Sequence, residues 1–255
     1  MSTGYLSGKV ALISGSYKNL GSVIALALAE QGANIVFNDL PGVLSQQEKD
    51  QLIDSVCRLG RKATAIDADI SSFASVQALQ EKIRQELGEV SIVVNCAGPF
   101  NMEPFSRLKE RDWDIVMNVN VKSVYITTSV FAGAMKAHGW GRIVNLSAGS
   151  SSVRNHGVYG LAKSAIRVLT EELALELGPE ITVNAVAPGQ IEESLPLIHA
   201  IDPTFGERYT ARSALKKLVT RKDVAQLIAM LCSPVADMIT GETIRIDGGA
   251  ELPRF

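Results

Sequence analysis

Short apolar, β-branched runs alternate with longer helical stretches almost from end to end of this 255-residue chain, and this alternation restricts its fold more than any other feature. Runs this short without a polar face are typical of parallel strands, because crossover helices cover both faces of such a sheet. The runs that we expect to form strands are VALI (10–13), NIVF (34–37), KATAI (62–66), SIVV (91–94), RIVNL (142–146), ITVNAV (181–186) and ETIRI (242–246).

The stretches between these runs have the periodicity of helices, and a glycine follows or closes each one. Repeated βα units of this kind predict an α/β fold, with one domain over residues 1–255. Its core would be a doubly wound, Rossmann-like parallel sheet with helices on both faces. The expected helices cover 20–31, 45–60, 72–88, 111–139 and 159–178, and left-handed caps are expected at Gly32, Gly60, Gly88, Gly139 and Gly178.

Composition excludes several classes of function. With 25 basic and 27 acidic side chains, the chain has no broad positive field for nucleic acid or acidic lipid. The longest apolar run, 23–29, is far shorter than the ~20 residues of a membrane helix, and the first ten residues lack a secretory signal. Three widely spaced cysteines and three scattered histidines predict neither a disulfide framework nor a metal site. We therefore expect a cytoplasmic protein with no nucleic-acid or membrane partner.

Two features at strand ends predict a nucleotide site, because an open parallel sheet binds ligands at the carboxyl ends of its strands. Gly15 and Gly21 flank the turn SGSYKNLG (14–21), which would direct backbone N–H groups at a pyrophosphate. Asp39 closes the second strand, where a carboxylate can accept from the hydroxyls of an adenine ribose. Each feature also has a structural interpretation, as an ordinary βα turn and a turn cap. Since one nucleotide would touch both, together they favour a dinucleotide site.

Tyr159 and Lys163 indicate the chemistry. They are four residues apart at the start of a helix, so their side chains share one face. Such a pair alone more often belongs to a solvated helix surface, but here it follows a buried strand and a Ser-rich loop. A nearby ammonium favours a phenolate, so Lys163 is expected to lower the pKa of Tyr159. A phenol tuned in this way can donate a proton to a carbonyl oxygen or accept one from an alcohol.

The sequence resembles the short-chain dehydrogenase/reductase family over essentially its whole length. The motifs that carry the resemblance are SGSYKNLG (14–21), Asp39, DADI (67–70), NCAG (95–98), WDIVMNVNV (113–121), YGLAK (159–163), APG (187–189) and ITGETIRIDGG (239–249). The resemblance implies that Tyr159 is the general acid/base, that Lys163 also holds the nicotinamide ribose, and that Asn120 keeps a water in the proton relay. The cofactor contacts that we expect are Gly15, Lys18, Asn19, Leu20, Gly21, Asp39, Asp69, Ile70, Asn95, Ala97, Gly98, Tyr159, Lys163, Pro188, Gly189 and Ile191.

Three positions depart from the family pattern. Asn19 stands where the family has its second motif glycine; asparagine tolerates left-handed backbone but is bulkier. Glu193 replaces the threonine that follows Pro-Gly, and a carboxylate facing the nicotinamide amide would accept from its NH₂. The position of the family's catalytic serine falls on or beside Ala148. The sequence therefore does not decide which serine of 147–152 has that role.

Ser147 is our choice for that serine. It is the first hydroxyl after the strand 142–146, so the sheet positions its backbone. A carbonyl substrate needs a second donor beside Tyr159 to orient it and to stabilise the developing oxyanion. The alternative role for Ser147 is a strand-end cap, while Ser150, Ser151 and Ser152 lie in a loop whose path the sequence does not fix.

These features predict an oxidoreductase that transfers a hydride between a nicotinamide cofactor and a carbonyl or secondary alcohol. NAD is expected over NADP, because Asp39 would repel a 2′-phosphate, although Lys18 could pair with it. Residues 192–213 are expected to form a substrate lid, and the helices 111–138 and 159–177 to form the interfaces of a homotetramer.

Two other functions stay open beside this one. The chain could be a nucleotide-binding sensor or scaffold that has lost catalysis, which the altered glycine, threonine and serine positions favour. It could also be a methyl transferase with a similar first turn, although Tyr159 and Lys163 have no use in methyl transfer. The sequence does not name the substrate.

Overall fold

The seven expected strands form a single parallel sheet. The computed structural model of the chain describes residues 4–152, 156–200 and 202–252. The strands lie in the order β3-β2-β1-β4-β5-β6-β7, so the predicted doubly wound sheet is confirmed. Their bounds are β1 (Val10–Ser14), β2 (Asn34–Asp39), β3 (Ala63–Asp67), β4 (Ile92–Asn95), β5 (Gly141–Leu146), β6 (Ile181–Pro188) and β7 (Thr243–Ile246).

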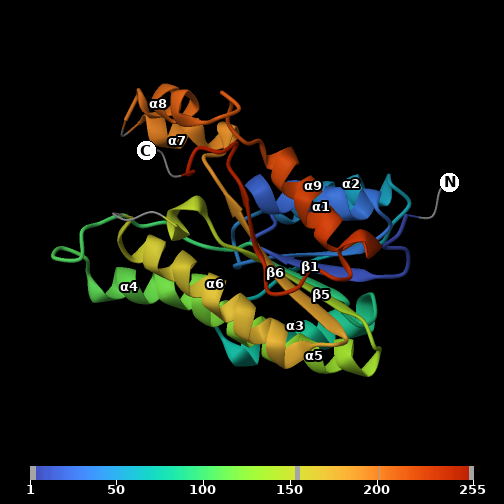
Figure 1. Cartoon of the computed structure of the whole chain (residues 1–255). Helices are drawn as coiled ribbons and strands as arrows, with labels where there is room; N and C mark the ends of the chain where they lie inside the picture. Colours follow the sequence, from blue (N-terminus) through green and yellow to red (C-terminus); the bar gives the residue numbers. More distant parts are fainter. Residues whose placement is uncertain (1–3, 153–155, 201, 253–255) are drawn as a thin grey trace.

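Helices cover both faces of the sheet (Figure 1). One face is covered by α1 (Asn19–Glu30), α2 (Gln46–Cys57) and α9 (Arg221–Leu231). The other is covered by α3 (Phe73–Glu86), α5 (Ser123–Ala137) and α6 (Gly157–Leu177). Each layer buries its own apolar cluster against the strands, and β5 and β6 are buried along their whole length. None of the helices in the described residues is long and apolar enough to cross a membrane.

The expected continuous helix over 111–139 is wrong. The chain forms α4 (Glu110–Met117), a π-helical turn η1 (Asn118–Lys122) and then α5. A π turn adds one residue to a helical turn and so shifts the phase of the hydrophobic pattern. We read the stretch 111–139 as one continuous pattern and did not detect this shift. Such turns are frequent at functional sites, and this one contains Asn120.

The expected left-handed cap at Gly178 is also wrong. Its φ is −65° and its ψ is 158°, which is extended backbone. Pro179 follows, and a proline disfavours helical conformations of the residue before it. The four other expected cap glycines have φ between +66° and +110°, as predicted.

The strand order reverses between β1 and β4, and the crevice outside their carboxyl ends is the ligand-binding position of this fold. The Ser14 hydroxyl joins the two strand ends, because its Oγ accepts the backbone N–H groups of Cys96 at 3.1 Å and Ala97 at 3.2 Å. The region predicted as a lid folds into η3 (Glu192–Ser194), α7 (Leu195–His199) and α8 (Phe205–Arg212). These helices lie beyond the end of β6 (Figure 1). Ile201, inside the predicted lid, is outside the described residues.

Candidate active site

The turn between β1 and α1 is shaped to receive an anion. Gly15 has a φ of +64°, and a Cβ there would lie 2.8 Å from Cα of Ala97, so only glycine fits this close approach. Asn19 takes a φ of +56°, so it adopts the left-handed backbone of the glycine that it replaces. Lys18 makes no side-chain cap, and the first turn of α1 contains no acidic residue. The N–H groups of this helix start are thus available to a pyrophosphate.

Asp39 is the last residue of β2, Asp69 lies just beyond the end of β3, and both are held by local hydrogen bonds. Asp39 Oδ1 accepts the Leu40 N–H at 2.9 Å, so the carboxylate does cap its turn. That bond leaves its second oxygen for a ribose hydroxyl. Asp69 Oδ1 accepts the N–H and the hydroxyl of Ser71 at 2.8 and 2.7 Å. Ile70 is buried in the apolar cluster beneath α3 and α5.

A polar network beside Asp39 was not found by sequence reasoning. The Tyr17 hydroxyl donates to Asp67 at 2.6 Å, and Lys49 Nζ donates to the other oxygen of that carboxylate at 2.7 Å. Burial and the Asp67 carboxylate raise the pKa of Tyr17, which keeps the phenol protonated. The ion pair with Asp67 neutralises the charge of Lys49. The positive charge of Lys18 contributes to lowering the pKa of Glu48, at the start of α2. No motif relates these residues, which come from three segments: the turn before α1, α2 and β3.

The two residues predicted to carry the chemistry lie together on the first turns of α6. Lys163 Nζ is 5.5 Å from the centroid of the Tyr159 ring and donates to the Leu146 carbonyl at 2.7 Å. A Cβ on Gly98 would overlap Asn120 Oδ1 and lie 3.1 Å from Lys163 Nζ. The loop after β4, the π turn and α6 therefore meet at one point at the carboxyl edge of the sheet.

Asn95 and Asn120 hold this meeting point. Asn120 Nδ2 donates to the carbonyls of Pro99 and Val116 at 3.0 and 2.9 Å. Its Oδ1 is buried and has no hydrogen-bond partner in the described structure, so it suits a bound water or other donor. Asn95 Nδ2 donates to Asn145 at 2.8 Å, and its Oδ1 accepts from Thr127 at 2.8 Å, which locks β4 to β5 and α5.

The expected lowering of the Tyr159 pKa is not found. Burial raises the pKa of Tyr159 to about 12, and the neighbouring Cys96 thiol adds to the rise. Lys163 is itself buried, which lowers its own pKa to about 8. Desolvation disfavours the charged form of both groups. The expectation was wrong because it considered the charge of Lys163 and not the burial of the pair.

The Ser147 hydroxyl does not point where we expected. Its Oγ donates to the backbone carbonyl of Lys163 at 2.9 Å, so its hydrogen holds α6 against the end of β5. The 3₁₀ turn η2 (Gly149–Ser151) offers two other hydroxyls, because Oγ of Ser150 and Oγ of Ser151 are buried and have no hydrogen-bond partner among the described residues. Ser164 Oγ donates to the Ser151 carbonyl at 3.0 Å and fixes this turn on α6. The structure thus favours the strand-end role for Ser147.

Glu193 also differs from expectation. Its carboxylate accepts the backbone N–H of Arg221, the first residue of α9, at 3.1 and 3.2 Å from its two oxygens. It therefore caps α9 and is not free to face a nicotinamide amide. Ile191 pairs with Val219, and the Glu192 N–H donates to the Val219 carbonyl at 2.9 Å. These contacts join the two ends of the lid at its base.

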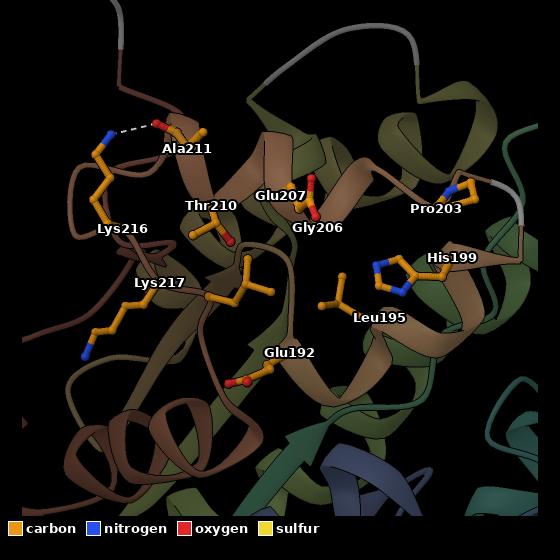
Figure 2. A pocket seen from close by; sticks show the side chains of 11 residues that line it. Glu192, Leu195, His199, Pro203, Gly206, Glu207, Thr210, Ala211, Lys216 and Lys217 are labelled. Atoms are coloured by element: carbon orange, nitrogen blue, oxygen red, sulfur yellow. Dashed lines mark hydrogen bonds between the residues drawn. The ribbon is translucent and has the colours of Figure 1, made fainter.

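The segment predicted as a lid, 192–213, has two distinct sides: one borders a hollow and the other faces Gly189. Figure 2 shows a hollow between α7 and α8, with His199 and Leu195 pointing into it. On α8, Tyr209 lies on the opposite side from this hollow, and a Cβ on Gly189 would be 2.5 Å from its Oη. The hollow has a volume of about 600 Å³ and is lined by Glu192, Leu195, His199, Pro203, Gly206, Glu207, Thr210, Ala211, Lys216, Lys217 and Leu218.

An apolar surface borders Tyr159 on another side. The rings of Phe100 and Tyr159 make an edge contact with centroids 4.9 Å apart. Phe100, Met102 and Phe105, all from the segment after β4, are about half exposed. Exposed apolar side chains next to a buried phenol can contact the carbon skeleton of a substrate.

Comparisons with known proteins agree with this geometry. A family sequence model described as Enoyl-(Acyl carrier protein) reductase matches residues 15–251. The 3-oxoacyl-(acyl-carrier-protein) reductase of Pseudomonas aeruginosa is 33% identical over 248 residues, covering 96% of this chain and 98% of that protein.

Two solved structures have closely similar folds. A gluconate 5-dehydrogenase from Burkholderia cenocepacia, in complex with NADP and tartrate, superposes with a TM-score of 0.90 at 28% identity, covering 98% and 97% of the two chains. A 7α-hydroxysteroid dehydrogenase complexed with NADH and 7-oxo glycochenodeoxycholic acid gives 0.88 at 29% identity, covering 96% and 94%. These two relatives hold different forms of the nicotinamide cofactor.

Proposed function

This chain belongs to the short-chain dehydrogenase/reductase family of oxidoreductases, which act on carbonyl or alcohol substrates with a nicotinamide cofactor, and we propose that Tyr159 is its proton donor and acceptor. The observation that carries this assignment is the convergence of Tyr159, Lys163 and Asn120 beside Gly98. The methyl-transferase alternative has no support from the family.

The residues present fit a dinucleotide. The open N-terminus of α1, the close approach of Gly15 to Ala97 and the second oxygen of Asp39 offer a pyrophosphate cradle and a ribose acceptor. Beside them, the contacts that we assign to the cofactor are Lys18, Asn19, Leu20, Gly21, Asp69, Ile70, Asn95, Gly98, Tyr159, Lys163, Pro188, Gly189 and Ile191. When bound, the cofactor supplies the hydride in reduction and takes it up in oxidation.

The chain's own residues then manage the proton and the oxyanion. In the reducing direction, Tyr159 donates its phenolic proton to the carbonyl oxygen of the substrate. A hydroxyl of η2, from Ser150 or Ser151, donates to the same oxygen and stabilises its developing charge. The Lys163 ammonium stabilises the phenolate left behind, and a water held by Asn120 Oδ1 would return the proton.

NAD is the cofactor form that we propose. Asp39 would lie on the ribose hydroxyls, and like charges at ~4 Å cost ~4 kcal/mol at an effective dielectric constant of 20. Of the two neighbouring cations, Lys49 is paired with Asp67, and the charge of Lys18 interacts with the Glu48 carboxylate.

The function and the cofactor form are tested together. Purified protein is assayed with NADH and NADPH against carbonyl compounds, and with NAD and NADP against alcohols. We expect kcat/KM to be about 10²-fold higher with NADH than with NADPH. The variant Asp39→Asn keeps an acceptor for the Leu40 N–H but removes the charge, and it should narrow this ratio at least about tenfold.

Glu86→Gln is the matched control, since it removes an exposed carboxylate at the end of α3, away from Asp39 and Lys18. Its NADH to NADPH ratio should stay near that of the wild type. A wild-type kcat/KM with NADPH equal to that with NADH would contradict the choice of NAD. Binding of cofactor without turnover on any compound would instead favour the sensor or scaffold alternative.

A homotetramer is the assembly that we propose. The exposed apolar side chains of α6 form a stripe with a spacing of seven residues, Leu161, Val168 and Leu175. Trp113 of α4 and Tyr125 of α5 are exposed on the neighbouring helices. Faces of this kind would be covered in an obligate assembly, which buries ~2,000 Å² or more at each interface.

Light scattering at micromolar concentration should give the mass of four chains. Val168→Glu/Leu175→Glu should lower this mass, because charges would enter the apolar contact, whereas Leu59→Glu at the end of α2 should not. A monomeric wild type would refute the proposal. The lid role of 192–213 and the cytoplasmic location stay predictions.

A further inference from the structure

Several buried polar atoms without a hydrogen-bond partner come from three segments at the carboxyl ends of β5 and β6. Within the described residues, these atoms are Oγ of Ser150, Oγ of Ser151, Oη of Tyr209 and Oε2 of Glu251. They come from η2, α8 and the C-terminal turn after β7. A buried polar group without a partner is costly, so a cluster of them indicates a ligand that the chain itself does not supply.

The Glu251 carboxylate packs directly on the serine turn. A Cβ on Gly149 would overlap its Oε1, so only glycine at this position allows the carboxylate to lie there. Gly149 begins η2, and the Ser150 carbonyl lies 3.4 Å from where a Cβ of Gly160 would be, next to Tyr159 in α6. The Glu251 carboxylate therefore contacts the first residue of the turn that carries Ser150 and Ser151, the hydroxyls proposed to contact the substrate.

Tyr209 approaches the same place from the lid. Its Oη lies over Gly189, and among the described residues it has no hydrogen-bond partner. Gly189 and Gly149 follow neighbouring strands, because β5 and β6 pair at Leu146 and Val186. Tyr209 and Glu251 thus cover adjacent strand ends, and the Glu251 carboxylate contributes to raising the pKa of Tyr209, of which burial is the main cause.

Nearby charged groups restrict the chemical class of the ligand. Asp247 is not a free partner, because its carboxylate accepts the N–H groups of Gly249 at 2.8 Å and Glu251 at 3.0 Å. Burial and repulsion by Asp247 raise the pKa of Glu251, whereas Arg245 and Arg212 lower it. Two carboxylates disfavour an anionic group here, and two guanidiniums disfavour a cationic one.

We propose that Glu251 and Tyr209 bind a hydroxyl group of the substrate next to its reacting carbon, which makes vicinal diols and hydroxyketones the preferred substrates. A hydroxyl suits the pair because it donates to the Glu251 carboxylate and accepts from the Tyr209 phenol. The exposed Phe100 and Met102 would contact the carbon skeleton on the other side. This inference rests on the proposed function, since it assumes that Tyr159 protonates the reacting oxygen.

The test compares alcohols that differ in the neighbouring hydroxyl. Oxidation by the full chain with NAD is measured on glycerol against isopropanol, and on a vicinal cyclohexanediol against cyclohexanol. We expect kcat/KM to be at least about tenfold higher for the hydroxylated member of each pair, because a site built to bond a hydroxyl rejects the analogue that lacks it. The dissociation constant of each alcohol, obtained from its effect on thermal unfolding with NAD present, should follow the same order.

Glu251→Gln and Tyr209→Phe should each reduce this preference about tenfold, because kcat/KM should fall further for the diol than for cyclohexanol. Glu242→Gln, at an exposed carboxylate just before β7, is the control and should leave the preference intact. Equal losses on both alcohols would overturn the proposal and assign Glu251 to positioning of the serine turn. A wild type without any preference, but with turnover that Tyr159→Phe abolishes, would overturn this inference alone. Turnover that does not depend on Tyr159 would overturn the proposed function.

Discussion

Tyr159→Phe is expected to lower kcat about 10³-fold in either direction while leaving the dissociation constant of NADH within about threefold of the wild type. Phenylalanine keeps the edge contact with Phe100 and the packing over Lys163, and removes only the atom that carries the proton. General acid–base catalysis contributes typically 10²–10⁴-fold, so the loss should lie in that range. Steady-state kinetics give kcat, and titration of NADH fluorescence gives the dissociation constant.

The pH profile of the wild type is the control for this assignment. With a pKa of about 12, Tyr159 is protonated at neutral pH and ready to donate, so the reducing direction should be fully active below pH 8. Lys163, with a pKa of about 8, loses its charge above that pH, and reduction should then decline. Oxidation requires the phenolate and should rise with pH. Residual turnover in Tyr159→Phe that keeps both limbs would contradict the role of this phenol.

The fold was predictable from the sequence because its strongest signals are local. Each strand of a parallel sheet buries both faces, so runs such as 142–146 and 181–186 contain almost no charge and stand out against amphipathic helices. The π turn at 118–122 was missed, since the only mark of one extra residue is a shift in the phase of the apolar pattern, and the helix 111–139 was read as continuous. The extended backbone at Gly178 was decided by the next residue, Pro179, which the glycine signal alone does not include.

The sequence predicted the position of the site's backbone well. It predicted the contacts and pKa values of the side chains less well. Residues fixed by the strand ends, such as Gly15, Asp39 and Gly98, lie where the sequence placed them, at the carboxyl edge. The pKa of Tyr159 depends on burial by distant segments, which no spacing encodes. Glu193 was misassigned because its partner, the Arg221 N–H, is 28 residues further along the chain.

The second large effect concerns the serine hydroxyls, and we expect the double variant Ser150→Ala/Ser151→Ala to lower kcat about 10²-fold. Both hydroxyls are buried, lack a partner in the part of the chain that the structure describes, and lie on the turn that packs against the first turns of α6. Loss of one preorganised oxyanion donor costs about 10²–10³ in kcat. The single variants, assayed on the same substrate, then show which of the two hydroxyls is the donor.

Ser147→Ala is the informative comparison because our sequence analysis favoured that residue. Its hydroxyl is already bonded to the Lys163 carbonyl, so its removal should lower the free energy of unfolding by about 1 kcal/mol and change kcat by less than about threefold. Ser152→Ala, at an exposed position after η2, should change neither quantity. Collapse of activity in Ser147→Ala with near-wild-type activity in the double variant would return the donor role to Ser147. In that case the bond to the Lys163 carbonyl must break when substrate binds, because a single hydroxyl hydrogen cannot serve both acceptors.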